Sequence, residues 1–403
     1  MSQIAGKTVY VLGAGASYHT GAPLLKDFLV TGRLLLDSGV QLRFKESFER
    51  IFELIDSLRA SSYYVEFDLD NLEHVFSLIE MGKQLNWEGS EQRFSDLRFV
   101  ILETLDKMCK LRWLNSGDFL PDEDYGNFSG LILSLNQARM SHLRQGKETF
   151  DPDSIITFNY DVMFDFALLT KSAVPDYCLS SDAERSKFFI EVDGFEKRKL
   201  KVHKLHGSTN WGICAEIQRK ETKNELHRNI QTIPLNFSGT VRPQFTHGQK
   251  YEFNIVTEIM QKITCPYCQT KSSLEPFIIP PTWSKRIENP QLAMVWASAV
   301  EEIKKAFQII VIGYSMPQTD TFFQYLLTLG LVSNSELNRI VVVNVDRKDN
   351  FKERYKRIFS RSLNDRGRLK FVCGVSFSDF VKKGAYMQTI GGQVEWQLPE
   401  DPS

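Results

Sequence analysis

The chain has 403 residues, of which 42% are hydrophobic and 25% charged, a composition typical of a globular protein. Its 49 basic and 50 acidic residues give a net charge of -1, so the totals do not indicate a nucleic-acid or membrane partner. No segment approaches the roughly 20 apolar residues that span a bilayer, and the start lacks a secretory pattern. Six thinly spread cysteines exclude a disulfide scaffold. Together these features predict a cytoplasmic protein.

The first predicted element is a buried strand over residues 7–12, rich in β-branched and aromatic residues. It leads into the glycine turn of residues 13–17, and a strand followed by such a turn opens a βαβ unit. Glycine permits a tight turn and close approach of a phosphate, which backbone N–H groups and the next helix would hold. However, Tyr18 replaces the third glycine of the dehydrogenase fingerprint, which argues against an ordinary dehydrogenase. A tight turn without a ligand is the structural alternative.

Residues 30–150 have helical periodicity without strand-like runs. Apolar residues at 72, 75, 76 and 79 fall on one helical face, and those at 94, 97, 101, 105 and 108 repeat the spacing. We therefore predict a helical insertion in this segment.

Strand patterns return in residues 154–158 and 200–205. The first is followed by Asn159, Tyr160 and Asp161, and the second by His206 and Gly207. Open α/β sheets place their ligands at the carboxyl ends of strands, so both polar groups stand where a ligand is expected. Residues 210–275 look like a small irregular module.

Alternation resumes with a helix over 290–306, a strand over 308–312, a helix from 320 and a strand over 339–345. The sequence thus predicts an α/β fold: a Rossmann-like parallel sheet with a large helical insertion and a small irregular module. We expect a single domain over 1–403, with its nucleotide-binding core in 7–25 and 154–346 and a C-terminal extension in 347–403.

Asn159 and His206 have complementary chemical uses. A histidine can accept a proton from a hydroxyl or water near neutral pH, and an asparagine amide can orient a hydroxyl without changing charge. The structural alternative is a buried core histidine and an asparagine that caps a strand end. A lone histidine favours that alternative.

Five blocks in order resemble the sirtuin (silent information regulator) family. They are the glycine turn, Thr157-Phe158-Asn159-Tyr160-Asp161, His206-Gly207, Gly313-Tyr314-Ser315, and a final strand ending in Asn344. The resemblance covers about residues 7–25 and 154–346. It implies an NAD-binding protein, and hydrolysis of NAD suits Asn159 and His206 because nicotinamide already leaves readily and mainly a positioned nucleophile is needed.

The resemblance also implies a role for each matched position. Asn159 and Asp161 would face the nicotinamide ribose and carboxamide, and His206 would be the base at the ribose hydroxyls. The remaining cofactor-binding positions would be Gly13, Ala14, Gly15 and Ser17 at the pyrophosphate, Pro23 near the nicotinamide, and Gly313, Ser315 and Asn344 at the adenosine half.

Two departures separate the chain from sirtuin deacylases. Residues 21–28 lack the arginine of the deacylase signature and displace its Asp-Phe pair. The family's structural zinc uses two Cys-x-x-Cys pairs, whereas this chain has only Cys265 and Cys268, with Cys214 alone at the earlier position. Since zinc needs four ligands, and only His227 or His247 could complete the set, a decayed module without bound metal is favoured.

With its helical insertion, the chain is more similar to the sirtuin-like NADase domains of bacterial antiphage defence proteins. That resemblance implies hydrolysis of NAD to nicotinamide and ADP-ribose, control by homo-oligomerisation, and a partner such as a HerA-type ATPase. Two alternatives stay open: a protein deacylase or ADP-ribosyltransferase, and a sensor that binds NAD or ADP-ribose without cleaving it.

Overall fold

A computed structural model describes most of the chain. The described residues are 6–61, 67–109, 112–113, 119–143, 151–180, 189–192, 195–214, 230–232, 235, 256, 274–279, 289–316, 321–359, 363, 365–384, 387–390 and 393–396. Among them, no helix is both long and apolar enough to cross a membrane.

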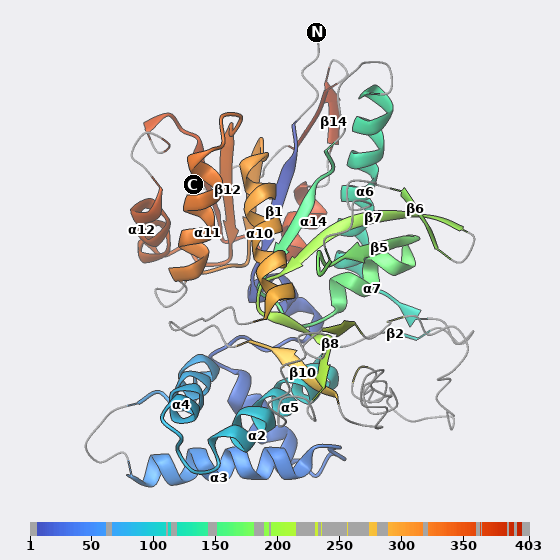
Figure 1. Ribbon diagram of the computed structural model, residues 1–403. Coiled ribbons are helices and arrows are strands. Elements are labelled where there is room, and N and C mark those ends of the chain that lie inside the picture. The colour runs from blue at the N-terminus through green and yellow to red at the C-terminus, as the bar shows by residue number, and fades with distance from the viewer. Residues whose placement is uncertain are drawn as a thin grey trace.

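A twisted parallel sheet forms the centre of the molecule (Figure 1). Its strands follow the spatial order β13-β12-β11-β1-β4-β7-β5, and β6 adds an antiparallel pair to β7. The strands are β1 (Thr8–Leu12), β4 (Ser154–Thr157), β5 (Ala173–Asp176), β6 (Phe189–Val192), β7 (Phe195–Lys204), β11 (Gln308–Ile312), β12 (Arg339–Asn344) and β13 (Leu369–Cys373). This order confirms the predicted Rossmann-like α/β fold. The sheet takes in β13, which lies beyond the core boundary expected at residue 346.

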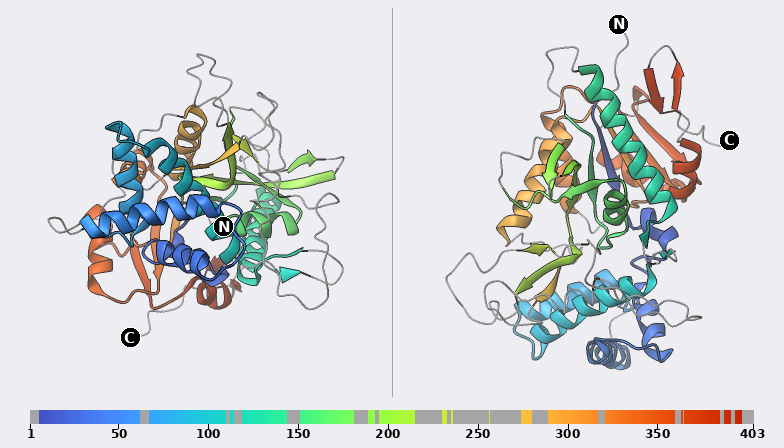
Figure 2. Two further views of the ribbon diagram at one scale, coloured as in Figure 1. Left: turned by 90° about the horizontal axis from the view of Figure 1, so that it is seen from below. Right: turned by 90° about the vertical axis from the view of Figure 1, so that its right-hand side faces the viewer.

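Helices cover both faces of this sheet (Figure 2). Because side chains alternate along a strand, Val9 and Val11 of β1 pack towards one face, and Tyr10 and Leu12 towards the other. The first face is covered by α10 (Pro290–Lys304), α11 (Thr321–Val332) and α12 (Asp349–Ile358), and the second by α6 (Glu123–Leu143), α7 (Met163–Thr170) and α14 (Phe377–Gly384). The helices predicted over residues 290–306 and from residue 320 are confirmed by α10 and α11.

The chain changes direction across the sheet between β1 and β11. From β1 it passes to β4 on one side, whereas β11 returns on the other side of β1. After β1, Ala16 joins the core on one face, and after β11, Tyr314 joins the core on the other. Strands β1 and β11 therefore form the topological switch point, where open sheets of this class bind ligands.

A separate helical unit lies beyond the carboxyl ends of the strands (Figure 1). It consists of α2 (Phe28–Asp37), α3 (Lys45–Ser61), α4 (Leu72–Gln84) and α5 (Ser90–Met108), which share their own apolar core. Tyr160 and Ile278 also belong to that core. The predicted insertion thus divides in two, because α6, within the same predicted range, packs on the main sheet instead.

A small sheet of β8 (Gly207–Cys214), β9 (Gln231–Thr232) and β10 (Leu274–Ile278) stands between the main sheet and the helical unit. Every residue of β8 is buried. The expectation of irregular structure from residue 210 is therefore wrong for residues 210–214. Further short elements are α1 (Ala14–Ser17), η1 (Tyr18–Thr20), β2 (Arg112–Trp113), β3 (Phe119–Leu120), β14 (Met387–Ile390) and β15 (Gln393–Trp396).

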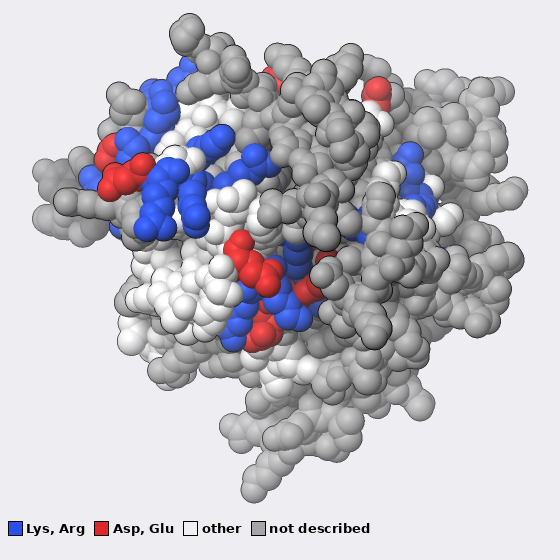
Figure 3. Space-filling model, turned by 90° about the horizontal axis from the view of Figure 1, so that it is seen from above, with Lys and Arg blue, Asp and Glu red and all other residues white. Residues whose placement is uncertain are grey.

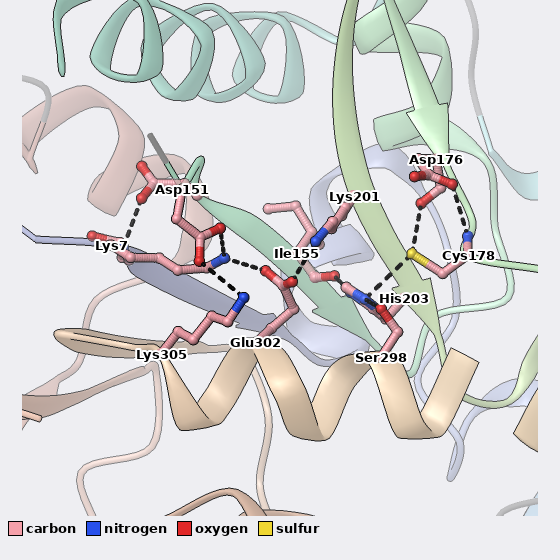
Figure 4. A network of polar contacts seen from close by, with 12 residues as sticks. Lys7, Asp151, Ile155, Asp176, Cys178, Lys201, His203, Ser298, Glu302 and Lys305 are labelled. Carbon is pink, nitrogen blue, oxygen red and sulfur yellow. Dashed lines mark hydrogen bonds and ion pairs between the residues drawn. The ribbon is translucent and has the colours of Figure 1, made fainter. Parts of the chain in front are cut away.

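The amino-terminal edge of the sheet carries charges of both signs. Seen from above, the described part of this face places Lys and Arg beside Asp and Glu (Figure 3). Beneath it, the buried carboxylate of Glu302 on α10 forms ion pairs with Lys7 and, at 2.7 Å, Lys201 (Figure 4). Although burial alone would raise it, these ammonium groups lower the pKa of Glu302 to about 2. This network holds α10 against the sheet, at the end opposite the ligand edge.

Candidate functional site

The glycine turn after β1 packs directly on the turn after β11. The Gly15 N–H donates to the Gly313 carbonyl at 2.9 Å, and Gly313 has a left-handed φ of 63°. A Cβ on Gly313 would lie 2.4 Å from the Ala16 nitrogen, and one on Gly13 would lie 2.6 Å from the Gly313 oxygen. Glycine is thus required here for the contact of two turns, a physical reason that sequence patterns alone do not reveal.

Asn159 stands at the end of β4, beside this pair of turns. Its backbone N–H donates to the Thr157 hydroxyl at 3.1 Å, which fixes the bend that leaves the strand. Its side-chain Nδ2 donates to the Gly13 carbonyl and to the Ser17 Oγ, both at 2.9 Å. A carbonyl oxygen accepts only, so the amide face towards Gly13 must be the NH₂ group. The Asn159 orientation is thereby determined by chemistry.

The other amide atom of Asn159, Oδ1, is buried and has no hydrogen-bond partner among the residues that the structure describes. Buried polar atoms are rarely left so, because an unmade hydrogen bond costs about 1–3 kcal/mol. An amide oxygen accepts from hydroxyl or N–H groups. The atom therefore suits a hydroxyl of a bound molecule or an ordered water.

Ser17 joins Asn159 to two further groups. Its hydroxyl lies 2.7 Å from the hydroxyl of Tyr125, a fully buried residue in the first turn of α6. It also interacts with the carboxyl group of Asp161. Burial raises the pKa of Asp161, while the Lys204 ammonium and the Ser17 hydroxyl act in the opposite direction. Asp161 is 7% exposed, and its Oδ1 accepts the Met163 N–H at 3.1 Å, so it supports Ser17 from within the protein.

His206 follows β7 and is enclosed by aromatic rings. Its imidazole packs edge-on against Phe158, with 5.1 Å between ring centroids, and lies 6.2 Å from the Tyr160 ring. The next residue, Gly207, has φ 81°, and a Cβ there would lie 2.1 Å from the Phe277 oxygen. The glycine therefore allows β10 to approach, and the Ile279 N–H then donates to the His206 carbonyl at 2.8 Å. Phe158 connects His206 to the turn after β11, because it stacks on Tyr314.

A buried ammonium group holds the start of β8 behind His206. Lys204 forms an ion pair with Asp165 at 3.2 Å and donates to the Asp161 carbonyl and to the Ser208 hydroxyl. Ser208 in turn donates to the Asn210 side chain at 2.7 Å. The polar side chains of β8, which hide its strand pattern in the sequence, thus form hydrogen bonds with one another and with Lys204.

Of the residues predicted for the adenosine half, Gly313 and Ser315 lie in the turn after β11, and Asn344 ends β12 beside that turn. Asn344 is buried, and its amide donates to the Tyr314 carbonyl at 3.4 Å, where the Tyr355 hydroxyl also donates. Ser315 is exposed, whereas Ala14, Gly15 and Pro23 are half-buried. The structure thus brings the glycine turn, Asn159, Asp161 and Gly313 together at one edge. Asn344 supports the same turn from below.

Sequence reasoning missed the contribution of α6 to this edge. Besides Tyr125, this helix begins after Asp122, whose carboxylate accepts the His19 Nε2–H at 2.7 Å and the N–H groups of Asp124 and Tyr125. His19 also stacks on Phe377, so it contacts both α6 and α14. A tyrosine at the start of a helix gives no local pattern that would have indicated Tyr125.

Only one group among the described residues has ligand-like spacing for a metal ion, namely His19, Asp122 and Asp124. Hydrogen bonds already account for it: Asp122 accepts from His19, and Asp124 accepts from the Ser378 hydroxyl. Cys265, Cys268, His227 and His247 lie outside the described residues. Cys214 is a buried free thiol within β8.

Comparisons with known proteins add a likeness in structure only. No family model and no curated protein matches the chain. Among solved structures it is similar to a complex of Sir2 with a p53 peptide and NAD⁺, at 13% identity and a TM-score of 0.36, with 94% of this chain and 91% of that chain covered. It is also similar to a mutant Sir2 homologue in complex with ADP-ribose, at 14% identity and a TM-score of 0.40, with 95% of this chain and 94% of that chain covered. The α/β, Rossmann-like fold is therefore shown by the order of the strands in the sheet.

Proposed function

We propose that this chain binds NAD at the carboxyl edge of β1, β4 and β11 and hydrolyses the bond between nicotinamide and ribose. One observation carries the proposal: the Asn159 amide is locked by Gly13 and Ser17 so that its Oδ1 presents a single free acceptor. Such an atom fits a ribose hydroxyl or the attacking water. The glycine turn at the switch point of the sheet supports phosphate binding beside it.

In this proposal the protein mainly positions the reacting hydroxyl or water, and it need not supply a strong acid for the leaving group. NAD contributes a leaving group that needs no prior activation. Asn159 orients a hydroxyl, and His206, held between Phe158 and Tyr160, accepts a proton. Ala14, Gly15 and Ser17 line the pyrophosphate side, Pro23 the nicotinamide side, and Gly313, Ser315 and Asn344 the adenosine side. Asp161 acts from behind, through Ser17.

The direct test is chromatography of NAD after incubation with the purified full chain. We expect nicotinamide and ADP-ribose to appear, and Asn159→Ala or His206→Ala to abolish turnover while circular dichroism stays unchanged. Asn334→Ala is the matched control. That side-chain amide also donates to backbone carbonyls, those of Ile303 and Ala306, but at the opposite end of the sheet. NAD left intact by the wild-type chain even in the presence of the product of the neighbouring gene, or turnover in both site variants, would refute the proposal.

Two alternatives are separated by the same assay. A deacylase releases nicotinamide only when an acylated peptide is added, whereas a hydrolase needs none. An NAD or ADP-ribose sensor binds without product, which calorimetry with ADP-ribose detects. The free Asn159 Oδ1 fits water or a sugar hydroxyl, a partner that both a hydrolase and a sensor would offer, so product formation is what separates the two.

The proposed cellular role is depletion of NAD in antiphage defence, controlled by homo-oligomerisation or by a HerA-type ATPase. Its support is the sequence resemblance alone. Mass photometry of the chain, and NAD turnover with and without the product of the neighbouring gene, test it. Turnover that does not depend on assembly or on that product would contradict this control.

A further inference from the structure

Tyr125 contributes its hydroxyl to the candidate site from a part of the chain that the five sequence blocks do not include. It lies at the start of α6, more than a hundred residues from Ser17, yet the two hydroxyl oxygens are 2.7 Å apart. Tyr125 is 1% exposed, and burial raises the pKa of its phenol well above the usual range, although the neighbouring Ser17 and Asn159 side chains act in the opposite direction. The phenol therefore keeps its proton at any physiological pH.

The groups around Ser17 favour one arrangement of donors and acceptors. A serine hydroxyl has one proton to donate and two lone pairs to accept with. The Asn159 NH₂ group can only donate to it, so one lone pair of Ser17 is used by Asn159, whose second proton goes to the Gly13 carbonyl. The nearby Asp161 carboxyl group draws the Ser17 proton towards itself. The Tyr125 hydroxyl, 2.7 Å away, then donates to the second lone pair of Ser17.

From this arrangement we infer that Tyr125 is a positioning residue, which acts through Ser17 to hold the Asn159 amide with Oδ1 towards the ligand. Without the Tyr125 hydroxyl, one lone pair of Ser17 has no donor, and the Ser17 hydroxyl is free to rotate. The lone pair that accepts from the Asn159 NH₂ group then shifts, and the Asn159 amide, with its free Oδ1, shifts too. The effect of this residue on turnover rests on the proposed function, whereas its effect on Asn159 does not.

The first experiment is a double-mutant cycle on NAD turnover with Tyr125→Phe and Ser17→Ala in the full chain. One hydrogen bond of ordinary strength corresponds to roughly a two- to tenfold change, so we expect Tyr125→Phe to lower kcat about fivefold with little change in KM. In the Ser17→Ala background the same substitution should have no further effect. Additive losses, or a loss confined to KM, would overturn the inference.

A matched control is Ser129→Ala, one turn further along α6. It also removes a buried hydroxyl, which donates to the Gly126 carbonyl at 3.0 Å, and it makes no contact with the site. We expect this variant to keep wild-type kcat. A fivefold loss in Ser129→Ala as well would show that α6 acts by stability alone.

The second experiment needs no turnover. With ¹⁵N-asparagine labelling, the side-chain NH₂ signal of Asn159 is assigned by its disappearance in Asn159→Ala. We expect its two protons to exchange slowly with water in the wild type and in Ser129→Ala, and about tenfold faster in Tyr125→Phe. Unchanged exchange in Tyr125→Phe would overturn the inference. If the wild type leaves NAD intact even with the product of the neighbouring gene, the proposed function fails, but this measurement still decides the role of Tyr125.

Discussion

Asn159 and Gly13 share a hydrogen bond of 2.9 Å that joins the end of β4 to the turn after β1. Because the Gly13 carbonyl can only accept, this contact decides which amide atom of Asn159 bonds to Gly13 and which is left without a partner. The geometry is sensitive to one atom. An aspartate at the same position has the same shape and cannot donate.

Asn159→Asp is therefore expected to remove activity and stability together. Its carboxylate would oppose the Gly13 oxygen, leaving two acceptors face to face, at a cost of about 1–3 kcal/mol of unfolding free energy. We expect at least a hundredfold loss of NAD turnover and a lower urea midpoint. Full activity in this variant would mean that the NH₂ group of Asn159 is not needed at Gly13.

The contact between the two turns makes a second prediction. Gly313→Ala introduces a Cβ 2.4 Å from the Ala16 nitrogen, whereas Gly39 has a similar left-handed φ of 72° with nothing within 4 Å of an added Cβ. Both substitutions incur the left-handed conformational cost of about 1 kcal/mol, but only the first forces two backbones apart. We expect Gly313→Ala to destabilise the chain by roughly 3 kcal/mol in denaturant unfolding, counting backbone displacement as overpacking. Equal losses in the two variants would contradict the tight contact.

Glu302 predicts a dependence of stability on pH. Its pKa in the folded chain is about 2, below its usual 4.5, so the unfolded chain takes up the proton first as the pH falls. The stabilisation is complete above about pH 5 and is lost towards pH 2, by roughly 3 kcal/mol. Glu302→Gln should lack this loss and should be less stable at pH 7, because Lys201 then loses its counter-charge and Lys7 keeps only that of Asp151.

The control for that experiment is Glu301→Gln on the same helix. Its carboxylate is more than half exposed and pairs with Lys304 near the surface, so the variant should keep the wild-type profile between pH 5 and 2. Urea unfolding at several pH values measures all three proteins. Parallel curves for Glu302→Gln and the wild type would show that this carboxylate does not carry the acid sensitivity.

Arg98 connects the helical unit to the strand that holds His206. Its Nε donates to the Ile278 carbonyl at 3.1 Å, and the adjacent Ile279 N–H donates to the His206 carbonyl. Arg98→Leu removes that donor without leaving a charge buried, and we expect hydrogen exchange at Ile279 to quicken about tenfold. Arg93→Leu is the control, because Arg93 lies on the same helix and its contacts with the Glu88 carbonyl and the Trp87 ring are local. Equal exchange in both variants would exclude the connection.

The parts of the fold that could be predicted are those that depend on local patterns of apolar and β-branched residues. Runs such as residues 308–312 are apolar and β-branched, and they form strands whatever surrounds them. Strand β8 was missed because Ser208 and Asn210 are polar in sequence, and their partners Tyr160 and Tyr177 are brought near only by folding. Tyr125 was not predicted for a similar reason. Its partner Ser17 is close in space but remote in sequence, and a periodic pattern along the chain cannot indicate such a pair.

The glycines at 13 and 15 were predicted for a phosphate, and the structure shows a further reason for them, since a Cβ on either would strike the turn after β11. Sequence patterns thus located the site but not the contacts that shape it. Those contacts are tertiary, and they come from α6 and from β11.

The hydrogen bond from Gly15 to Gly313 has a thermodynamic consequence for any ligand at this edge. The two turns are ordered against each other during folding, so binding there needs little further loss of backbone entropy at these residues. Association at the turns should resemble that of a rigid receptor, with rates set by diffusion and orientation rather than by a loop that must first close. Any slow step in binding would then belong to other segments.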